Sequence, residues 1–202
     1  MKQWLENYGY LLVILAAVCV VFVIILYFAA KAYRKRTALY KAEEAEIKRL
    51  VALKEKFRPV TKEAIENASA SELLEGIALS YQLTLQKEED IEGKFSLLND
   101  DIKDIYALDV FVQDKTSKEF FSQNGAIIKD RIIPALEKIG MAEFSEKIKP
   151  IHAMYDNSNE EVSYDIGKIE EFDIFMENSA VLEEIKLKSA EYIKRNFESF
   201  IN

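Results

Sequence analysis

The chain has 202 residues, with 35 acidic and 27 basic side chains, one histidine, one cysteine and a formal net charge of −8. A single cysteine, Cys19, excludes an intrachain disulfide and a thiolate metal cage, so the core must stabilise the fold. The acidic balance argues against direct binding of nucleic acid, because nucleic-acid-binding surfaces are basic.

The N-terminal region contains an uncharged stretch of twenty-two residues, Gly9–Ala30. At about 1.5 Å per residue, such a helix reaches about 33 Å, enough for the roughly 30 Å hydrocarbon core of a bilayer. We predict an uncleaved single-pass transmembrane helix, since a cleaved signal would have a shorter apolar core and basic residues before it. The small side chains of the span leave homo-oligomerisation within the membrane open, although no GxxxG pair is present.

A basic collar follows the span. Because positive residues beside a span tend to stay in the cytoplasm, we expect the N-terminus outside the cell membrane and residues 37–202 inside. The collar side chains are expected at the membrane interface, where long basic side chains reach the lipid headgroups. They are Lys31, Arg34, Lys35 and Arg36.

Composition divides the chain into the anchor with its collar (1–36), a helical stalk (37–67) and an acidic domain (68–202). The stalk carries charge pairs at i and i+4, such as Glu44 with Lys48, but too few apolar heptad positions for a coiled coil. Pro59 is expected to break the stalk helix. The distal domain has 15 basic and 28 acidic side chains, so nearly all of the negative charge lies there.

The distal domain has helical signals from its start. Ser69 and Glu72 have the spacing of a capping box before an apolar run to Leu85. Asn99 can cap the next helix, and Ser117 is expected to cap a short one. The acidic residues between Leu85 and Asn99 predict a loop: Glu88, Glu89, Asp90 and Glu92.

The second half of the domain continues the helical pattern. Apolar residues between 128 and 139 recur at the spacing of a buried stripe, and Gly140 is placed to end that helix in the left-handed conformation. Pro134 predicts either a kinked helix or two helices that meet at Ile133. No alternating strand pattern appears, so the predicted class is all-α. Further helices are expected at 142–154, 168–177 and 180–200.

Little in the sequence indicates catalysis or a cofactor. His152 stands alone among apolar residues, which favours a packed helical histidine over a catalytic base. The segment beginning at Asp156 resembles a calcium loop, but Glu161 occupies the position that requires glycine. Carboxylate pairs such as Asp100 with Asp104 are expected to point to solvent. We expect no metal, no cofactor and no enzymatic activity; a hydrolase or metal enzyme would have to depend on His152 or on such a pair.

Three features of the distal domain resemble the bacterial DNA-mimic protein family. They are a helix centred on Tyr106, the pair Phe120-Phe121 followed by Asn124-Gly125, and the segment Ala135–Gly140. The resemblance covers residues 70–202, and Asp114-Lys115-Thr116 stands where the family usually shows a glycine pair. It implies an all-α fold with an acidic surface that imitates DNA phosphates and occupies a DNA-binding protein.

The acidic surface expected to bind a partner lies in the run 156–177, which contains eight acids against one base, Lys168. The leading hypothesis is a membrane-anchored, non-enzymatic domain that binds a basic-surfaced protein. The alternatives are a DNA-mimic regulator, and a membrane scaffold or immunity-type protein whose charge serves only solubility. The candidate partner-binding residues are Asp156, Glu160, Glu161, Asp165, Glu170, Glu171, Asp173 and Glu177.

Overall fold

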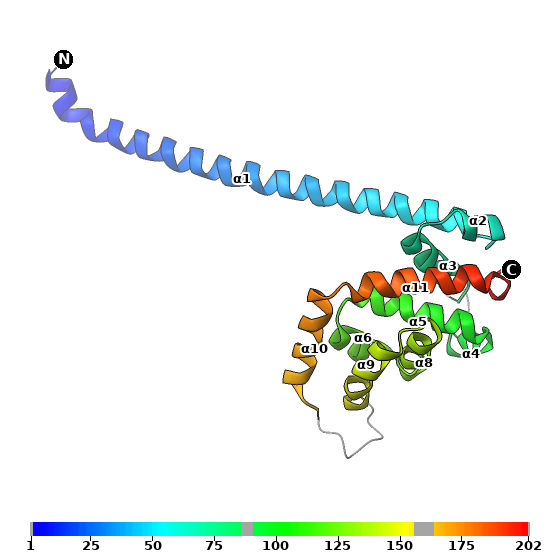
Figure 1. The fold of residues 1–202 in the computed structure, drawn as a ribbon. Coiled ribbons are helices and arrows are strands. Elements are labelled where there is room, and N and C mark those ends of the chain that lie inside the picture. Colours follow the sequence, from blue (N-terminus) through cyan, green and yellow to red (C-terminus); the bar gives the residue numbers. More distant parts are fainter. Residues whose placement is uncertain (1, 86–90, 156–163, 202) are drawn as a thin grey trace. The chain divides into compact units, whose positions relative to one another are not determined.

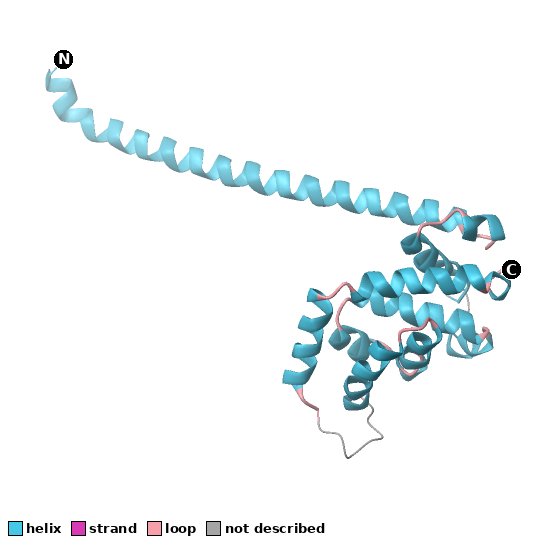
Figure 2. Cartoon of the chain, in the orientation of Figure 1, coloured by secondary structure: helices cyan, strands magenta, loops and turns pink. Residues whose placement is uncertain are grey.

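The computed structural model describes residues 2–85, 91–155 and 164–201 (Figure 1). It divides into two units, Met1–Val51 and Ala52–Asn202. Every regular element in the described ranges is helical, which confirms the predicted all-α class (Figure 2). The elements in chain order are α1 (Lys2–Lys56), α2 (Lys62–Glu66), α3 (Ala70–Leu85), α4 (Ile91–Leu97), α5 (Asp100–Asp114), α6 (Ser117–Gln123), α7 (Ala126–Lys129), α8 (Ile132–Lys138), α9 (Ala142–Met154), α10 (Ile166–Asn178), α11 (Val181–Arg195) and the 3-10 turn η1 (Phe197–Ser199).

The first unit is helical from Lys2 onward as part of α1. The predicted span Gly9–Ala30 lies mostly on residues whose side chains are outside the described part of the chain. Among the residues that are described, none of the helices combines the length and apolar character needed to cross a membrane. The four collar side chains are exposed, and the expected pair is present, with Lys48 Nζ 2.7 Å from Glu44 Oε1.

The second unit begins earlier than the domain boundary expected at residue 68. Leu53 and Phe57, which the sequence analysis assigned to the stalk, are buried in the core together with Val60 and Ile65. Phe57 lies against Gly76 of α3, where a side chain would have no room. This segment is therefore part of the core, because its apolar side chains have a surface to cover on α3.

Three long helices, α3, α5 and α11, pack against one another at the centre of the second unit (Figure 1). Two of the expected caps begin helices there. The side chain of Asn99 accepts a hydrogen bond from the backbone N–H of Ile102 at 2.8 Å, and Ser69 and Glu72 form the reciprocal capping box. Each cap satisfies backbone donors that the first turn of a helix leaves without partners.

Helices α6, α7 and α8 pack against α5, while α9 packs on α8 and α10 packs on α6. Phe111 of α5 packs edge to face on Phe120, and Phe144 of α9 stacks on Phe172 of α10, with ring centroids 5.1 Å and 5.8 Å apart. Gly140 ends α8 with φ of 85°, as predicted, and the Met141 N–H donates to the Leu136 carbonyl.

Several expected boundaries differ from the structure. The segment between residues 128 and 139 forms two helices, α7 and α8, as one of the alternatives for Pro134 predicted, but they meet at Asp130-Arg131 and not at Ile133. Pro134 lies in the first turn of α8, where its missing N–H costs no intrahelical hydrogen bond. Thr116, and not Ser117, caps α6. Glu92 lies within α4 instead of a loop, and the last expected helix ends at Arg195 before η1.

Candidate partner-binding groove

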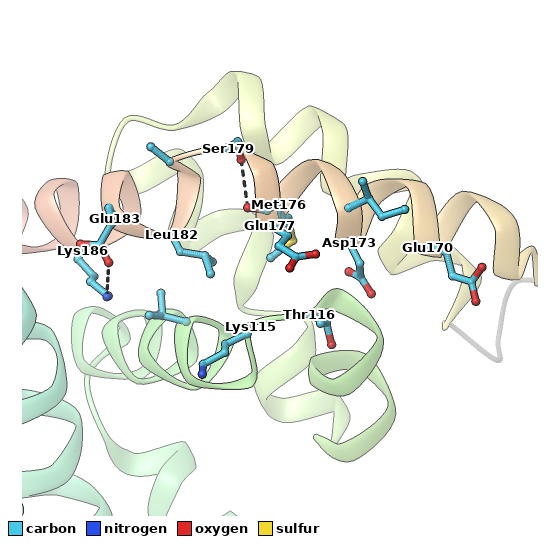
Figure 3. A pocket seen from close by; sticks show the side chains of 13 residues that line it. Lys115, Thr116, Glu170, Asp173, Met176, Glu177, Ser179, Leu182, Glu183 and Lys186 are labelled. Carbon is cyan, nitrogen blue, oxygen red and sulfur yellow. Dashed lines mark hydrogen bonds and ion pairs between the residues drawn. The ribbon is translucent and has the colours of Figure 1, made fainter. Parts of the chain in front are cut away.

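A groove of about 790 Å³ lies along α10 in the second unit (Figure 3). Helix α10 and the start of α11 form one side, and the end of α5 with the turn Lys115-Thr116 that follows it forms the other. Its apolar lining comes from Val112, Ile174, Met176 and Leu182. The charged residues that line it are Lys115, Glu170, Asp173, Glu177, Glu183 and Lys186.

Helix α10 is held in place at its start and along its buried face. Asp165 caps it, because its side chain accepts hydrogen bonds from the backbone N–H groups of Gly167 and Lys168 at 3.0 and 3.2 Å. Ile169, Phe172 and Met176 recur at i, i+3 and i+7, and all three are buried. The cap and the buried stripe fix the rotation of α10 about its axis, so the face next to the stripe always lines the groove.

Three acids follow one another along this second face. Glu170, Asp173 and Glu177 also recur at i, i+3 and i+7, and all three line the groove (Figure 3). Asp173 is already engaged, since its Oδ1 accepts hydrogen bonds from the backbone N–H and the hydroxyl of Ser117, each at 2.6 Å. Within the described residues, Glu170 and Glu177 make no hydrogen bond or ion pair, and both are exposed.

The two lysines of the groove are in different situations. Lys186 Nζ lies 2.5 Å from Glu183 Oε1, so these opposite charges compensate each other. Lys115 follows the end of α5 with φ of 63°, the left-handed region that favours glycine. The conformation turns the chain directly into α6, where Thr116 caps the helix by accepting a hydrogen bond from the Glu119 N–H.

A smaller depression of about 420 Å³ lies beside the groove and shares Ser179 and Ala180 with it. Of its two aromatic residues, Phe144 is buried, and Phe175 is already covered by a cation of the same chain, with Lys147 Nζ 4.5 Å from the ring centroid. The lysine is attracted to the electron-rich face of the ring and occupies the position that a cation of a partner would take. The groove along α10 is therefore the better candidate for an external partner.

The structure separates the eight predicted partner-binding acids into three groups. Asp156, Glu160 and Glu161 lie outside the described residues. Asp165 and Asp173 have structural roles as hydrogen-bond acceptors at the starts of α10 and α6. Glu170, Glu171 and Glu177 are exposed on α10, and of these Glu171 does not line the groove.

Only one member of the pair Asp100 and Asp104 points to solvent as expected. Asp100 is exposed, but Asp104 is only 3% exposed, and its carboxylate forms ion pairs with Arg131 and with Lys138. These ion pairs form because Arg131, directly before α8, and Lys138, at its end, both lie against α5. The carboxylate therefore links two helices and is unavailable to a partner.

The same cluster extends to α11 through Asp101. The hydroxyl of Tyr192 donates to Asp101 Oδ1 at 2.7 Å, and Lys138 Nζ lies 3.1 Å from the same oxygen. Burial raises the pKa of Asp101, but these hydrogen bonds outweigh it and the pKa lies below its usual value. Burial, followed by the hydrogen bond to Asp101, raises the pKa of Tyr192 to about 12. This cluster, too, has a structural role.

His152 packs as the sequence suggested. Its ring meets Phe121 edge to face at 5.6 Å, and its Nε2 lies 2.9 Å from Asp130 Oδ1. In the part of the chain that is described, no group of three or more histidine, cysteine, aspartate and glutamate side chains is arranged to hold a metal ion. The calcium-like segment from Asp156 to Glu161 lies outside the described residues.

Sequence reasoning missed the apolar half of the groove. Ile174 is 57% exposed although it lies in the middle of α10. The only available signal was its place in the sequence: it lies between the positions of the buried stripe, next to Asp173. Val112 of α5 and Leu182 of α11 line the same groove, which could not be read from either segment alone.

Comparisons with known proteins find no matching family model, no matching curated protein and no matching solved structure.

Proposed function

We propose that this chain is a single-pass membrane protein whose acidic helical domain lies in the cytoplasm and binds another protein without catalysing a reaction. The observation that carries the proposal is the pair Glu170 and Glu177, two carboxylates with no partner among the described residues beside an open apolar groove. Exposed apolar surface rimmed by charge is typical of protein interaction sites.

The contrast with the other acids supports this function. Asp101, Asp104, Asp165 and Asp173 all accept hydrogen bonds or form ion pairs within the domain. If the acidic surface served only solubility, no relation to an apolar groove would be required. The acids of α10 instead border apolar side chains that remain in contact with water, an arrangement that a partner can cover.

The membrane anchor is supported by the sequence of the first unit. The uncharged stretch Gly9–Ala30 and the basic collar that follows it have the length and the charge order of a single-pass anchor with a cytoplasmic C-terminus. The collar would face the anionic headgroups of the inner leaflet, while an acidic domain would be repelled by them. The anchor would thus limit the domain to partners at the membrane surface.

Photo-crosslinking of the full chain in its native membranes tests the binding function. A photoreactive residue placed at position 174 should capture a basic-surfaced protein, and the variant Glu170→Gln/Glu177→Gln should lose it. Glu171→Gln is the matched control, because Glu171 is exposed on the same helix but does not line the groove. Equal capture by all three chains would leave solubility as the role of the charge and would favour the scaffold alternative.

The same experiment separates DNA mimicry from other protein binding. If the captured protein binds DNA, duplex DNA should compete with the chain for it, as expected of a surface that imitates phosphates. Orientation requires its own measurement: protease added outside sealed spheroplasts should leave residues 52–202 intact. Digestion of that unit from outside would contradict the cytoplasmic placement.

A further inference from the structure

The exposed isoleucine of α10 identifies the part of the groove that lacks a cover. Ile174 is 57% exposed, whereas Met176 on the same helix is 1% exposed. Leu182 of α11 lines the same groove (Figure 3), and so does Val112 of α5. Burying a side chain the size of isoleucine contributes roughly 1.5–3 kcal/mol, so a partner gains affinity by covering this surface.

The charges around this apolar surface determine the sign of the charge that a partner must present to it. Glu183 and Lys186 compensate each other, and Asp173 is occupied by Ser117. Among the described residues this leaves one cation, Lys115 at the end of α5, and two carboxylates, Glu170 and Glu177, so the unpaired charge of the groove is negative on balance. Glu170 and Glu177 are seven residues apart on one face of α10. At 1.5 Å per residue their positions are separated by about 10.5 Å, which is two helical turns. Lysines or arginines at i and i+7 of a second helix have the same separation.

The open form of the groove favours a peptide over a small molecule. A small ligand is normally buried over 70–90% of its surface, which requires a concave site. Here one wall carries an isoleucine that is mostly in water, and the acids lie along the full face of a helix of 13 residues. Such a surface corresponds to the helix-in-groove mode of recognition, in which an amphipathic helix inserts its apolar face.

We propose that the groove along α10 binds an amphipathic helical segment of a partner protein, with apolar residues on Ile174 and Leu182 and basic residues opposite Glu170 and Glu177. The inference rests on the proposed function and specifies the kind of segment that the partner contributes. Nucleic acid does not fit this surface, because phosphates would meet carboxylates.

The test uses the full-length chain in zwitterionic detergent micelles and a defined probe. The probe is an amphipathic peptide of leucine and lysine, about fourteen residues or four helical turns long, with a benzophenone at the centre of its apolar face. Irradiation should crosslink it to the segment that contains Ile174 or to the segment that contains Leu182, as mapped by mass spectrometry. A peptide with glutamate at every lysine position should give no crosslink there.

Charge reversal in the groove provides the matched comparison. The variant Glu170→Lys/Glu177→Lys should lower the yield of the groove crosslink about tenfold, because two attractive charges become repulsive. Ile174→Ser should also lower it, whereas Glu171→Lys should leave it unchanged. All four substituted positions are exposed, and circular dichroism verifies that each of the three variants keeps its helix content.

Several results would overturn the inference. Crosslinks elsewhere on the chain, or equal yields from Glu170→Lys/Glu177→Lys and Glu171→Lys, would show that the peptide does not use this groove. Crosslinks between two copies of a chain that carries a photoreactive residue at position 174, with no peptide present, would make the groove a self-association surface instead.

The inference and the proposed function can fail separately. Capture of a protein in native membranes that depends on Glu170 and Glu177, without a groove crosslink to the peptide, would leave the function and remove the helical-segment inference. A specific groove crosslink to the peptide, without such capture in native membranes, would show a competent groove and contradict the proposed function.

Discussion

The carboxylate of Asp173 on α10 accepts two hydrogen bonds from Ser117, the first residue of α6, 56 positions earlier in the chain. Ser117 is fully buried, so this contact fixes α10 against the start of α6. The groove lies between α10 and the turn Lys115-Thr116 that leads to Ser117. Its geometry therefore depends on an acid that the sequence alone had assigned to the partner surface.

Removal of this contact should destabilise the domain. Asp173→Ala leaves the Ser117 hydroxyl and N–H without their acceptor, and loss of such a capping interaction costs about 1–2 kcal/mol. Urea unfolding of the full chain, followed by circular dichroism, measures the effect. Glu171→Ala is the control on the same helix and should change the free energy of unfolding by less than about 0.5 kcal/mol. Equal stability of the two variants would contradict the structural role of Asp173.

A substitution of Lys115, which has a left-handed backbone conformation at the end of α5, should stabilise the domain instead of destabilising it. Lys115→Gly should raise the free energy of unfolding by up to about 1 kcal/mol, because glycine adopts this φ without the steric cost of a Cβ. Lys115→Val should lower it, since a β-branched side chain is the least tolerated there. Gly140 has φ of 85° and provides the reciprocal case: Gly140→Ala should destabilise, although it has open space around it. Thermal unfolding of the three variants measures these signs, and a destabilising Lys115→Gly would contradict the argument.

The buried carboxylate of Asp104 should contribute more to stability than its exposed neighbour. Asp104→Ala removes the buried acceptor that Arg131 and Lys138 share and leaves them only their ion pairs with Asp100 and Asp101, at a cost of about 1–3 kcal/mol. Asp100→Asn is the control, since Asp100 is exposed and its loss leaves Arg131 paired with Asp104. Urea midpoints of the two variants compare the costs. Equal urea midpoints for Asp104→Ala and Asp100→Asn would show that burial of the Asp104 ion pairs adds nothing to the stability of the fold.

The hydroxyl of Tyr192 gives a pH-dependent contribution to stability. Its pKa is raised to about 12 in the folded chain, whereas an unfolded tyrosine has a pKa of about 10. A raised pKa means that folding favours the protonated form, so the contribution is complete below pH 10 and is lost as the pH rises from about 10 to 12. Tyr192→Phe should therefore lose less stability than the unmodified chain over that interval. Unfolding midpoints at several pH values test this, and parallel curves for the two chains would contradict it.

The close approach of Gly76 to Phe57 tests where the second unit begins. A Cβ at position 76 would collide with the Phe57 ring, which is fully buried. Gly76→Ala should destabilise by about 1–3 kcal/mol, as overpacked core substitutions do. Gly76→Ala should lower the free energy of unfolding less when it is added to Phe57→Leu than when it is made in the unmodified chain, because the smaller leucine leaves room for the new Cβ. Urea unfolding of the full chains measures the coupling, and strictly additive effects would contradict the contact.

The sequence by itself determined the all-α class and many helix ends, because those signals are local. The capping box of Ser69 with Glu72, the cap at Asn99 and the left-handed Gly140 each depend on hydrogen bonds within a few residues. A pattern repeated every three or four residues likewise shows which face of a helix is apolar. These predictions required no knowledge of what lies across the core.

Only the tertiary structure decided which acids serve the fold and which face a groove. Asp104 is buried because α8 brings Arg131 and Lys138 to it, and Asp173 is engaged because Ser117 lies opposite. Glu170 and Glu177 belong to the same acidic run but meet no such partner among the described residues. The environment of a carboxylate depends on cations and donors that are distant in sequence, so composition can count the acids but cannot distinguish these roles.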